Sequence, residues 1–191
     1  MSEKWITYPL TKNKATACPT RILYFDTETN YDESKTNQTH SFRLAVTAFQ
    51  CYKKGIPYGK TQWRTFHKPN EVWAYITALG YSGSCLWTIA HNLDFDFSAI
   101  QGFRHITQGD WTVKFWAISS TNFILRIKRK RRQIQFLDSM GFIGASIKSL
   151  GKTLGTPKLP MPPQIASDSL WEEYCKRDVL VMKLGTEAFI R

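Results

Sequence analysis

Short apolar runs and alternating segments divide the first half of the chain into strands. Arg21–Phe25 has the length and residue types of a buried strand, and the polar stretch after it, 26–39, predicts a loop. Between 69 and 80, Pro69-Asn70 offers a turn and an N-cap, apolar residues recur at helical spacing, and Gly80 ends the pattern. The patterns together predict strands over 21–25, 42–52, 62–67 and 86–90 and helices over 70–79 and 94–106.

The second half mixes β-like and helical segments. Residues 111–118 and 122–127 read as two strands of a hairpin joined by Ser119-Ser120-Thr121, and an apolar run follows at 134–137. Helical patterns cover about 146–154 and 169–189, with a proline-rich stretch, 156–163, between them. Strands followed by mixed strands and helices predict an α/β or α+β domain with one mixed sheet.

Length and composition limit the class of protein. A chain of 191 residues is long enough for one domain, and we expect an N-terminal arm over 1–20, a single domain over 21–191 and a basic β insertion over 104–135 within it. The hydrophobic content of 42% excludes a disordered chain. No apolar run approaches the roughly 18 residues of a membrane helix, and the N-terminus lacks the apolar core of a signal peptide. We therefore expect a soluble, cytoplasmic protein with no membrane partner, in the host cytoplasm if it is viral.

The cysteines and the net charge point in different directions. Cys18, Cys51, Cys85 and Cys175 contain no C-x-x-C pair, so the sequence predicts buried or half-buried thiols and no zinc knuckle. The formal net charge of +11 suggests an anionic partner, most simply a phosphate backbone.

Two carboxylates follow the first predicted strand. In Phe25-Asp26-Thr27-Glu28-Thr29, strand alternation puts Asp26 and Glu28 on the same face. Two converging carboxylates repel each other unless a cation lies between them, and hard divalent ions such as Mg²⁺ prefer oxygen ligands. The motif is short, and taken by itself it is more typical of a capped strand end.

Two further constellations strengthen the metal interpretation. Residues 89–96 run from a strand into a helix, and Asp96, favoured over Asp94 by its spacing from Asn92, lies near the helix start. On the last predicted helix, Tyr174 and Asp178 are four residues apart and share a face. A phenol beside a metal-bound carboxylate can orient an attacking water. Taken alone, Tyr174 and Asp178 are more typical of an exposed helix pair, and the metal interpretation depends on the other two motifs.

The order F-D-x-E-T, H-N-x-x-F-D and Y-x-x-x-D resembles the three motifs of DEDDy-type 3′–5′ exonucleases of the ribonuclease H-like superfamily. Over roughly residues 21–185 the chain is most similar to the proofreading exonuclease domain of protein-primed family B DNA polymerases, with Phe136–Met140 and Lys158–Met161 matching further segments of that group. The resemblance implies a mixed five-stranded sheet flanked by helices, with an inserted basic β-hairpin. It also implies hydrolysis of single-stranded DNA 3′ ends to nucleoside 5′-monophosphates.

The resemblance assigns roles to individual residues. Two divalent ions, Mg²⁺ or Mn²⁺, would be held by Asp26, which bridges both, by Glu28 and Asp178 on one ion, and by Asp96 on the other, largely through water. Tyr174 would position the nucleophilic water, and Lys158 would contact the scissile phosphate. The single-stranded 3′ end would be lined by Thr29, His91, Asn92, Phe95, Ser139 and Met140. The chain departs from the group in having Ala99 where an aromatic residue is common and Met140 in place of leucine.

A dense basic run precedes the segment at 134–137. Flanked by aromatic residues within the predicted hairpin, it predicts contact with a nucleic-acid strand or duplex through Lys128, Arg129, Lys130 and Arg131. A solvated strand edge, where lysine discourages aggregation, and a nuclear localisation signal remain alternatives.

Three other functions stay open at this point. DEDDy enzymes also degrade RNA, so a 3′–5′ exoribonuclease is one alternative. A non-catalytic basic module that binds nucleic acid and a structural domain of a replication complex are two others. The length does not decide between a stand-alone nuclease and the excised proofreading domain of a polymerase, and partners would be single-stranded DNA 3′ ends, with RNA possible, and a polymerase or replication proteins.

Overall fold

A computed structural model describes residues 18–31, 39–81, 83–119 and 122–190. Its strands are β1 (Arg21–Asn30), β2 (Ser41–Lys53), β3 (Ile56–Phe66), β4 (Cys85–Ala90), β5 (Thr112–Ile118), β6 (Phe123–Arg129) and β7 (Arg132–Asp138). Its helices are α1 (Pro69–Leu79), α2 (Leu93–Ala99), α3 (Gly102–Gln108), α4 (Met140–Ile143), α5 (Ile147–Thr153) and α6 (Asp168–Ile190). None of these helices is both long enough and apolar enough to cross a membrane.

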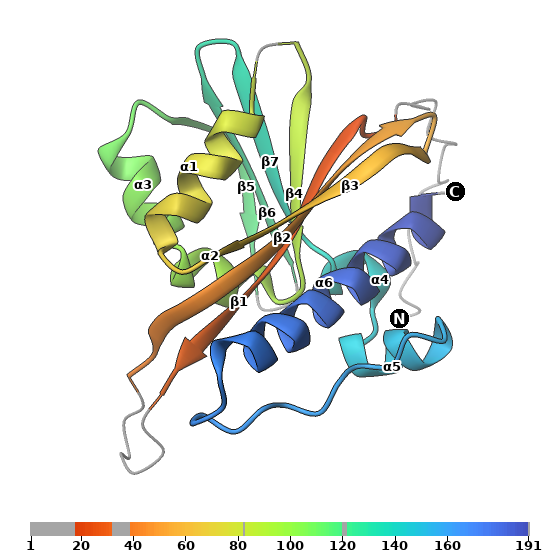
Figure 1. Ribbon diagram of the computed structural model, residues 1–191. Helices are drawn as coiled ribbons and strands as arrows, with labels where there is room; N and C mark the ends of the chain where they lie inside the picture. The colour runs from red at the N-terminus through yellow and green to blue at the C-terminus, as the bar shows by residue number, and fades with distance from the viewer. Residues whose placement is uncertain (1–17, 32–38, 82, 120–121, 191) are drawn as a thin grey trace, which may run out of the picture.

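The strands form one mixed sheet in the order β3-β2-β1-β4-β7-β6-β5 (Figure 1). β4 pairs in parallel with β1 on one side and with β7 on the other, and the remaining pairs are antiparallel. The predicted mixed sheet flanked by helices is therefore confirmed. The described chain has seven strands in it rather than five, because β6 pairs with β7 and so makes the basic hairpin a continuation of the sheet.

Helices cover both faces of the sheet. Strand residues alternate between two hydrophobic clusters: Leu23 and Phe25 face α1, α2 and α3, whereas Ile22 and Tyr24 face the side of α5 and α6. α6 packs across β1 and β2 on its face, as Figure 1 shows. The two faces are called here the α1 face and the α6 face.

Three elements differ from the sequence expectation. β1 continues to Asn30 through the predicted loop, because β2 pairs with it as far as Ser41, with a register shift between Glu28 and Thr29. β3 begins at Ile56 rather than at 62, since its first residues continue the hairpin with β2. The N-terminal arm falls outside the described residues up to position 17, as do 32–38 and positions 120–121 of the predicted turn.

The helix expected over 94–106 is two helices. Gln101 adopts a left-handed conformation with φ of 57°, which interrupts the hydrogen-bond ladder between α2 and α3. Gly102, which opens α3, lies so close to Phe97 that an added Cβ would be 2.5 Å from the ring. The break therefore allows α3 to fold back over the buried Phe97.

A buried polar network joins α6 to β1 and β2. The Glu187 carboxylate accepts hydrogen bonds from Lys183 Nζ at 2.7 Å and from the Tyr52 hydroxyl at 2.8 Å, and the Tyr52 and Tyr24 hydroxyls lie 2.9 Å apart. Lys183 is 9% and Glu187 5% exposed. Both charged groups lie largely out of solvent, so each depends on the other.

We expect Glu187→Ala to lower the free energy of unfolding by about 3–5 kcal/mol, because it leaves the Lys183 ammonium buried without a counter-charge. Urea denaturation followed by circular dichroism measures the change. The control is Glu71→Ala, which removes an exposed pair with Lys68 at 3.9 Å and should cost less than about 1 kcal/mol. Equal losses in the two variants would contradict the account.

Candidate active site

The predicted catalytic residues meet at one edge of the sheet. β1, β4 and β7 run parallel to one another, so their carboxyl ends lie at the same end of the sheet. The first motif near the end of β1, the second motif after β4 and the segment after β7 therefore come together there. Asp26 and Glu28 follow the alternation of Ile22 and Tyr24 and therefore lie on the α6 face. α6 crosses this edge and supplies Asp178.

Asp26 and Glu28 form a compact group with a third side chain, Cys175 of α6. One ligand atom from each of the three residues lies within 4.8 Å of the others. The Cys175 thiol donates to Asp26 Oδ2 at 3.3 Å and to the Asp26 carbonyl at 3.4 Å. The sequence analysis treated Cys175 only as a buried thiol. Its position next to Tyr174 in the third motif was the one signal that placed it near the site.

Asp96 approaches the group from the α1 face. Its Oδ1 accepts hydrogen bonds from the Thr27 backbone N–H at 2.9 Å and from the Thr27 hydroxyl at 2.7 Å, and the residue is only 2% exposed. Thr27 lies between Asp26 and Glu28 in sequence but points to the opposite face, so β1 holds all three carboxylates at once. Asp94, the competing candidate, is exposed.

Asp178 is held by a lysine from the proline-rich stretch. Lys158 Nζ donates to Asp178 Oδ2 and lies 4.6 Å from the centroid of the Tyr174 ring. Tyr174 in turn packs edge-on against Trp171, with ring centroids 5.8 Å apart. Asp178 Oδ1 is buried and has no hydrogen-bond partner among the residues that the structure describes. Lys158, which the resemblance placed at the scissile phosphate, thus contacts both α6 residues of the third motif.

Burial and mutual repulsion favour the protonated forms of the carboxyl groups. Burial and the nearby Asp178 raise the pKa of Asp26 to about 7. Burial, Asp26 and Asp178 raise the pKa of Glu28 to about 9, and burial with Asp26 also raises the pKa of Asp96. Asp178 has a pKa raised by burial, which the Lys158 hydrogen bond partly offsets. The four acids therefore repel one another strongly enough that their ionised forms need added positive charge.

The raised pKa of Lys158 favours its charged form, whereas the raised pKa values of the carboxyl groups favour their neutral forms. Burial opposes the charge of Lys158, but its hydrogen bonds to Asp178 and Tyr174 outweigh this and raise its pKa. Burial raises the pKa of Tyr174, and Lys158 partly offsets that rise. Lys158 thus stays an ammonium ion and Tyr174 a neutral phenol at neutral pH.

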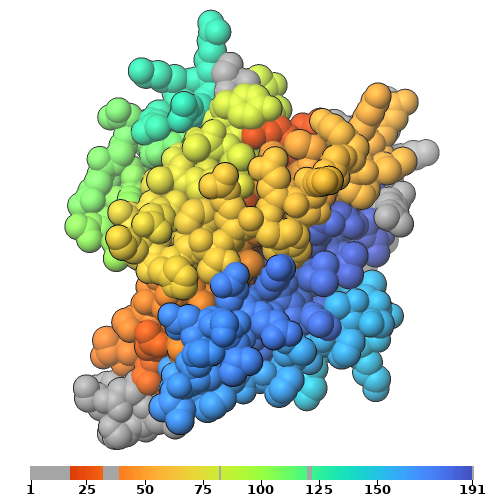
Figure 2. Space-filling view, in the orientation of Figure 1, coloured from red at the N-terminus to blue at the C-terminus, as the bar shows by residue number. Residues whose placement is uncertain are grey.

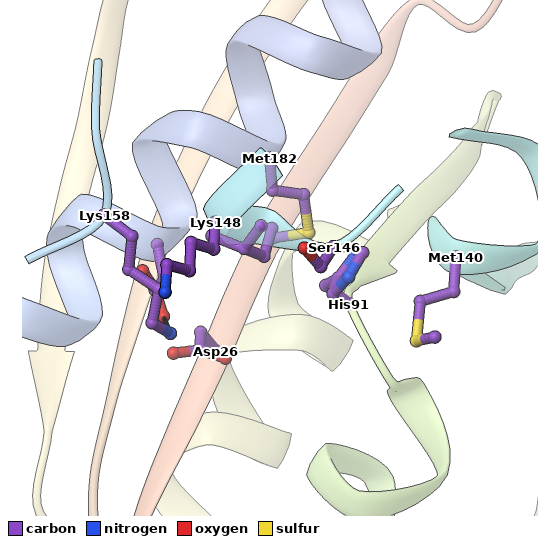
Figure 3. A pocket seen from close by; sticks show the side chains of 9 residues that line it. Asp26, His91, Met140, Ser146, Lys148, Lys158 and Met182 are labelled. Atoms are coloured by element: carbon purple, nitrogen blue, oxygen red, sulfur yellow. Dashed lines mark hydrogen bonds and ion pairs between the residues drawn. The ribbon is translucent and has the colours of Figure 1, made fainter. Parts of the chain in front are cut away.

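A cavity of about 420 Å³ opens beside the carboxylates (Figure 3). Asp26, Asp178 and Lys158 line one part of it, and His91 and Met140 line another. Figure 3 shows Lys148 and Lys158 approaching Asp26 from separate segments of the chain. Four further lining residues, to which no role was assigned from the sequence, are Ser146, Ile147, Lys148 and Met182.

Predicted substrate-lining residues gather in two places. His91 Nδ1 lies 2.9 Å from Ser139 Oγ beside this cavity, and Met140 is 47% exposed there. Thr29 and the 39%-exposed Phe95 instead line a second cavity, of about 470 Å³, where Thr29 Oγ1 lies 2.9 Å from His40 Nδ1. His40 follows a polar stretch with no motif, so its place beside Thr29 could not be predicted from the sequence.

The start of α2 is fixed by an acid that the sequence analysis passed over. Asp138, at the end of β7, accepts hydrogen bonds from the backbone N–H groups of Asn92, Leu93 and Met140, at 3.1, 3.1 and 2.9 Å. Asn92 itself is exposed and left-handed, with φ of 69°. Asp138 thus orients both the second motif and the segment that carries Met140.

The basic run does not join this cavity. Lys128, Arg129, Lys130 and Arg131 lie at the end of β6 and in its turn to β7, which is the end of β7 opposite to Asp138. Six residues of strand separate the two ends, or about 20 Å. Figure 2 shows this turn protruding at the edge of the molecule away from α6.

The donor set fits hard divalent cations. Four carboxylates supply oxygen ligands, which Mg²⁺ and Mn²⁺ prefer, and the buried Asp178 Oδ1 lacks any other partner. A cation would also relieve the repulsion that raises the pKa values of Asp26 and Glu28. The residues that would hold such a cation are Asp26, Glu28 and Asp178. Asp96 lies nearby, and its Oδ1 already accepts hydrogen bonds from Thr27.

Comparison with known proteins shows a related fold. No family model matches the chain, and no curated protein is significantly similar to it in sequence. A solved structure of similar fold is that of Phi29 DNA polymerase complexed with primer-template DNA and incoming nucleotide substrates, with a TM-score of 0.58 and 10% identity over 90% of this chain. The same polymerase complexed with single-stranded DNA gives a TM-score of 0.57 and 13% identity, also over 90% of this chain.

The likeness has a defined extent. At these identities it concerns the fold alone. The chain spans 31%, or about a third, of the length of the polymerase chains that it matches. The polymerase is a protein-primed family B enzyme, the group that the sequence motifs resemble.

Proposed function

We propose that the chain is a metal-dependent 3′–5′ exonuclease that hydrolyses the terminal phosphodiester of single-stranded DNA and releases nucleoside 5′-monophosphates. The observation that carries the proposal is the convergence of Asp26, Glu28, Asp96 and Asp178, where burial, together with repulsion between neighbouring carboxylates, raises the pKa values of Asp26, Glu28 and Asp96. The related fold of a DNA polymerase bound to single-stranded DNA supports DNA as the substrate.

Two divalent ions, Mg²⁺ or Mn²⁺, would supply Lewis-acid stabilisation of the attacking and leaving oxygens of the phosphate. Asp26, Glu28 and Asp178 would hold these ions, with Asp26 as the ligand common to both. Asp96 has one oxygen bound to Thr27 and the other available for a water or an ion. β1 thereby holds Asp26, Glu28 and Thr27 in one rigid segment, which fixes the ligand geometry before substrate binds.

The chain's own groups would bind the strand end and order the water. Lys158, kept as an ammonium ion, can move from Asp178 to a phosphate oxygen within the same cavity. Tyr174, kept as a phenol, can donate to or accept from the attacking water without losing its own proton. His91, Ser139 and Met140 border the space where the terminal nucleotide would lie.

The test is hydrolysis of 5′-labelled single-stranded DNA and RNA of the same sequence with Mg²⁺ or Mn²⁺. We expect stepwise shortening of the DNA from its 3′ end, release of 5′-monophosphates, and no shortening in EDTA. Preferential shortening of the RNA would favour the exoribonuclease instead. Binding of both oligonucleotides without any shortening would favour a non-catalytic module.

Tyr174→Phe should lower turnover by about ten- to a hundredfold, because it removes the hydroxyl that orders the water but leaves the carboxylates in place. Single-turnover hydrolysis of the DNA measures the effect. Tyr75→Phe, which removes another buried phenol oxygen, far from the cavity, is the matched control and should keep the wild-type rate. An unchanged rate in Tyr174→Phe would rule out the role given to the phenol.

A further inference from the structure

The basic run and part of the sheet near it are not used by the proposed hydrolysis. Beyond α6, toward β5, side chains on the α6 face become exposed. Phe115 is 50% exposed, and Lys128 is also exposed. The face that carries Asp26 and Glu28 therefore continues past the helix as an open surface.

Strand register shows which side chains share this surface. Phe115 pairs with Arg126, Arg126 with Gln135, and Gln135 with Trp87 of β4, so these four residues form one row across the sheet. Directly paired residues point to the same face. Trp87 packs against the cluster under α6, which places the row on the α6 face.

A second row lies two residues further from the carboxylates. It contains Thr112, Lys128, Gln133 and Cys85, paired in the same way. At about 3.3 Å per residue, the first row lies about 13 Å and the second about 20 Å from the level of Asp26. None of the eight side chains in the two rows is acidic.

The two rows lead to the tip of the basic turn, whereas the side chains of Arg129 and Arg132 and the cavity that they line lie on the α1 face. Arg129 lies 4.7 Å from the centroid of the Trp111 ring, and Arg132 donates to the Thr77 carbonyl at 3.4 Å. Lys130 and Arg131 at the tip are exposed. A cavity of about 270 Å³ lies here, lined by Arg129, Lys130 and Arg132 together with Asp110.

Arg126 is held flat against the sheet. Its Nε and Nη2 both donate to Gln135 Oε1, at 3.0 and 2.6 Å. A planar guanidinium next to an exposed phenyl ring gives a surface on which bases can stack, and the lysines beside it can contact phosphates. Aromatic side chains in a positively charged groove are the features that bind single strands without sequence preference.

We propose that the surface formed by Phe115, Arg126, Lys128 and the exposed tip residues Lys130 and Arg131, here called the strand track, binds the single-stranded DNA upstream of its 3′ end. The inference rests on the proposed function for the polarity of the strand, because the 3′ end lies at the carboxylates on the same face. Phe115 and Lys128 also lie four and three strands away from β1, at about 4.8 Å per strand, so each is more than about 20 Å from Asp26. A stacked strand advances about 3.4 Å per nucleotide, so an oligonucleotide of about four residues reaches neither side chain. Affinity should therefore depend on substrate length.

The test compares two double variants that change the same kinds of residue. Phe115→Ala/Lys128→Glu alters the strand track, and Tyr58→Ala/Lys60→Glu alters an exposed aromatic and an exposed lysine on β3, at the opposite edge of the sheet. Both are made in the full chain carrying Asp26→Ala, so that DNA is bound without being hydrolysed. Fluorescence anisotropy measures the affinity for 5′-labelled oligonucleotides of about four and about 20 residues.

The track variant should bind the longer oligonucleotide about tenfold more weakly, with a salt slope reduced by about one, and the shorter one unchanged. The β3 variant should match the parent. Lys128→Glu alone, at an exposed position, repeats the test if the double variant unfolds. Unchanged affinity for the longer oligonucleotide, or an equal loss in the β3 variant, would overturn the proposal and would favour β5 as an edge that pairs with a protein strand.

Failure of the strand track and failure of the nuclease give different results. Hydrolysis of the four-residue substrate by the chain with an intact Asp26, without any length effect on binding, would refute the track alone. A length effect on binding without hydrolysis of either substrate would refute the nuclease and leave the track as a nucleic-acid surface.

Discussion

Asp26→Ala should lower exonuclease turnover by about a thousandfold or more while leaving DNA affinity within about threefold of the parent. Asp26 interacts with each of Glu28, Asp178 and Asp96, so its loss removes a ligand that the two proposed metal ions would share. Binding persists because the carboxylates repel phosphate rather than attract it. Single-turnover hydrolysis and anisotropy measured on one protein preparation separate the two effects.

The control for this substitution is Asp94→Ala. Asp94 lies two residues from Asp96 but is exposed, and its removal should leave turnover within about twofold of the parent. Turnover that survives both Asp26→Ala and EDTA would show that the carboxylates do not carry the reaction. Loss of turnover with a parallel loss of folding, seen by circular dichroism, would be distinguished by repeating the assay with Asp26→Asn.

The metal-free protein should become less stable as pH rises from about 5 to 9, and divalent cations should reverse this. The folded pKa values are about 7 for Asp26 and about 9 for Glu28, both above their usual values near 4. Since the folded state holds these protons more tightly than the unfolded state, stability is greatest below pH 4 to 5 for these groups and falls as pH rises toward the folded values. The expected loss is on the order of 2–3 kcal/mol, or about 5–10 °C in Tm.

Thermal unfolding in EDTA across this pH range measures the loss, and a second series with Mg²⁺ or Mn²⁺ measures its recovery. The stabilisation by cation should be larger at pH 8 than at pH 5, because protonated carboxyl groups are poor ligands. Glu28→Gln should flatten the metal-free profile. A Tm that is independent of both pH and cation would show that the four acids are not coupled as described.

The fold class predicted from the sequence is confirmed, whereas the roles given to the candidate site residues stay predictions. Asp26, Glu28, Asp96 and Asp178 could be assembled because alternation, helix spacing and motif order are local signals, and the structure brings all four together. The contacts of Thr27 and Cys175 could not be predicted. Thr27 contacts Asp96 only because α2 packs on one face of β1, and Cys175 contacts Asp26 only because α6 packs on the other. Pairing between distant strands leaves no such signal in one sequence.

The same limit explains the differences in the sheet. The apolar pattern of the first strand ends at Phe25. The polar residues 26–30 continue the strand because they pair with β2, which one sequence does not reveal. The basic hairpin was predicted as a local element, but whether it stands apart or extends the sheet depends on β6 pairing with β7. That pairing also moves the basic residues to the end of the sheet opposite to the carboxylates, which spacing along the chain does not reveal.

The contrast between two cysteines makes the opening of the site measurable by chemistry. Cys18 is exposed, whereas Cys175 is buried beneath Asp26. An alkylating reagent should modify Cys18 at once but reach Cys175 only when α6 detaches from β1. The rate at which Cys175 is modified therefore measures the rate of local unfolding where α6 packs on β1. A cation bound between the carboxylates of α6 and β1 should lower the rate of Cys175 modification without altering the rate of Cys18 modification.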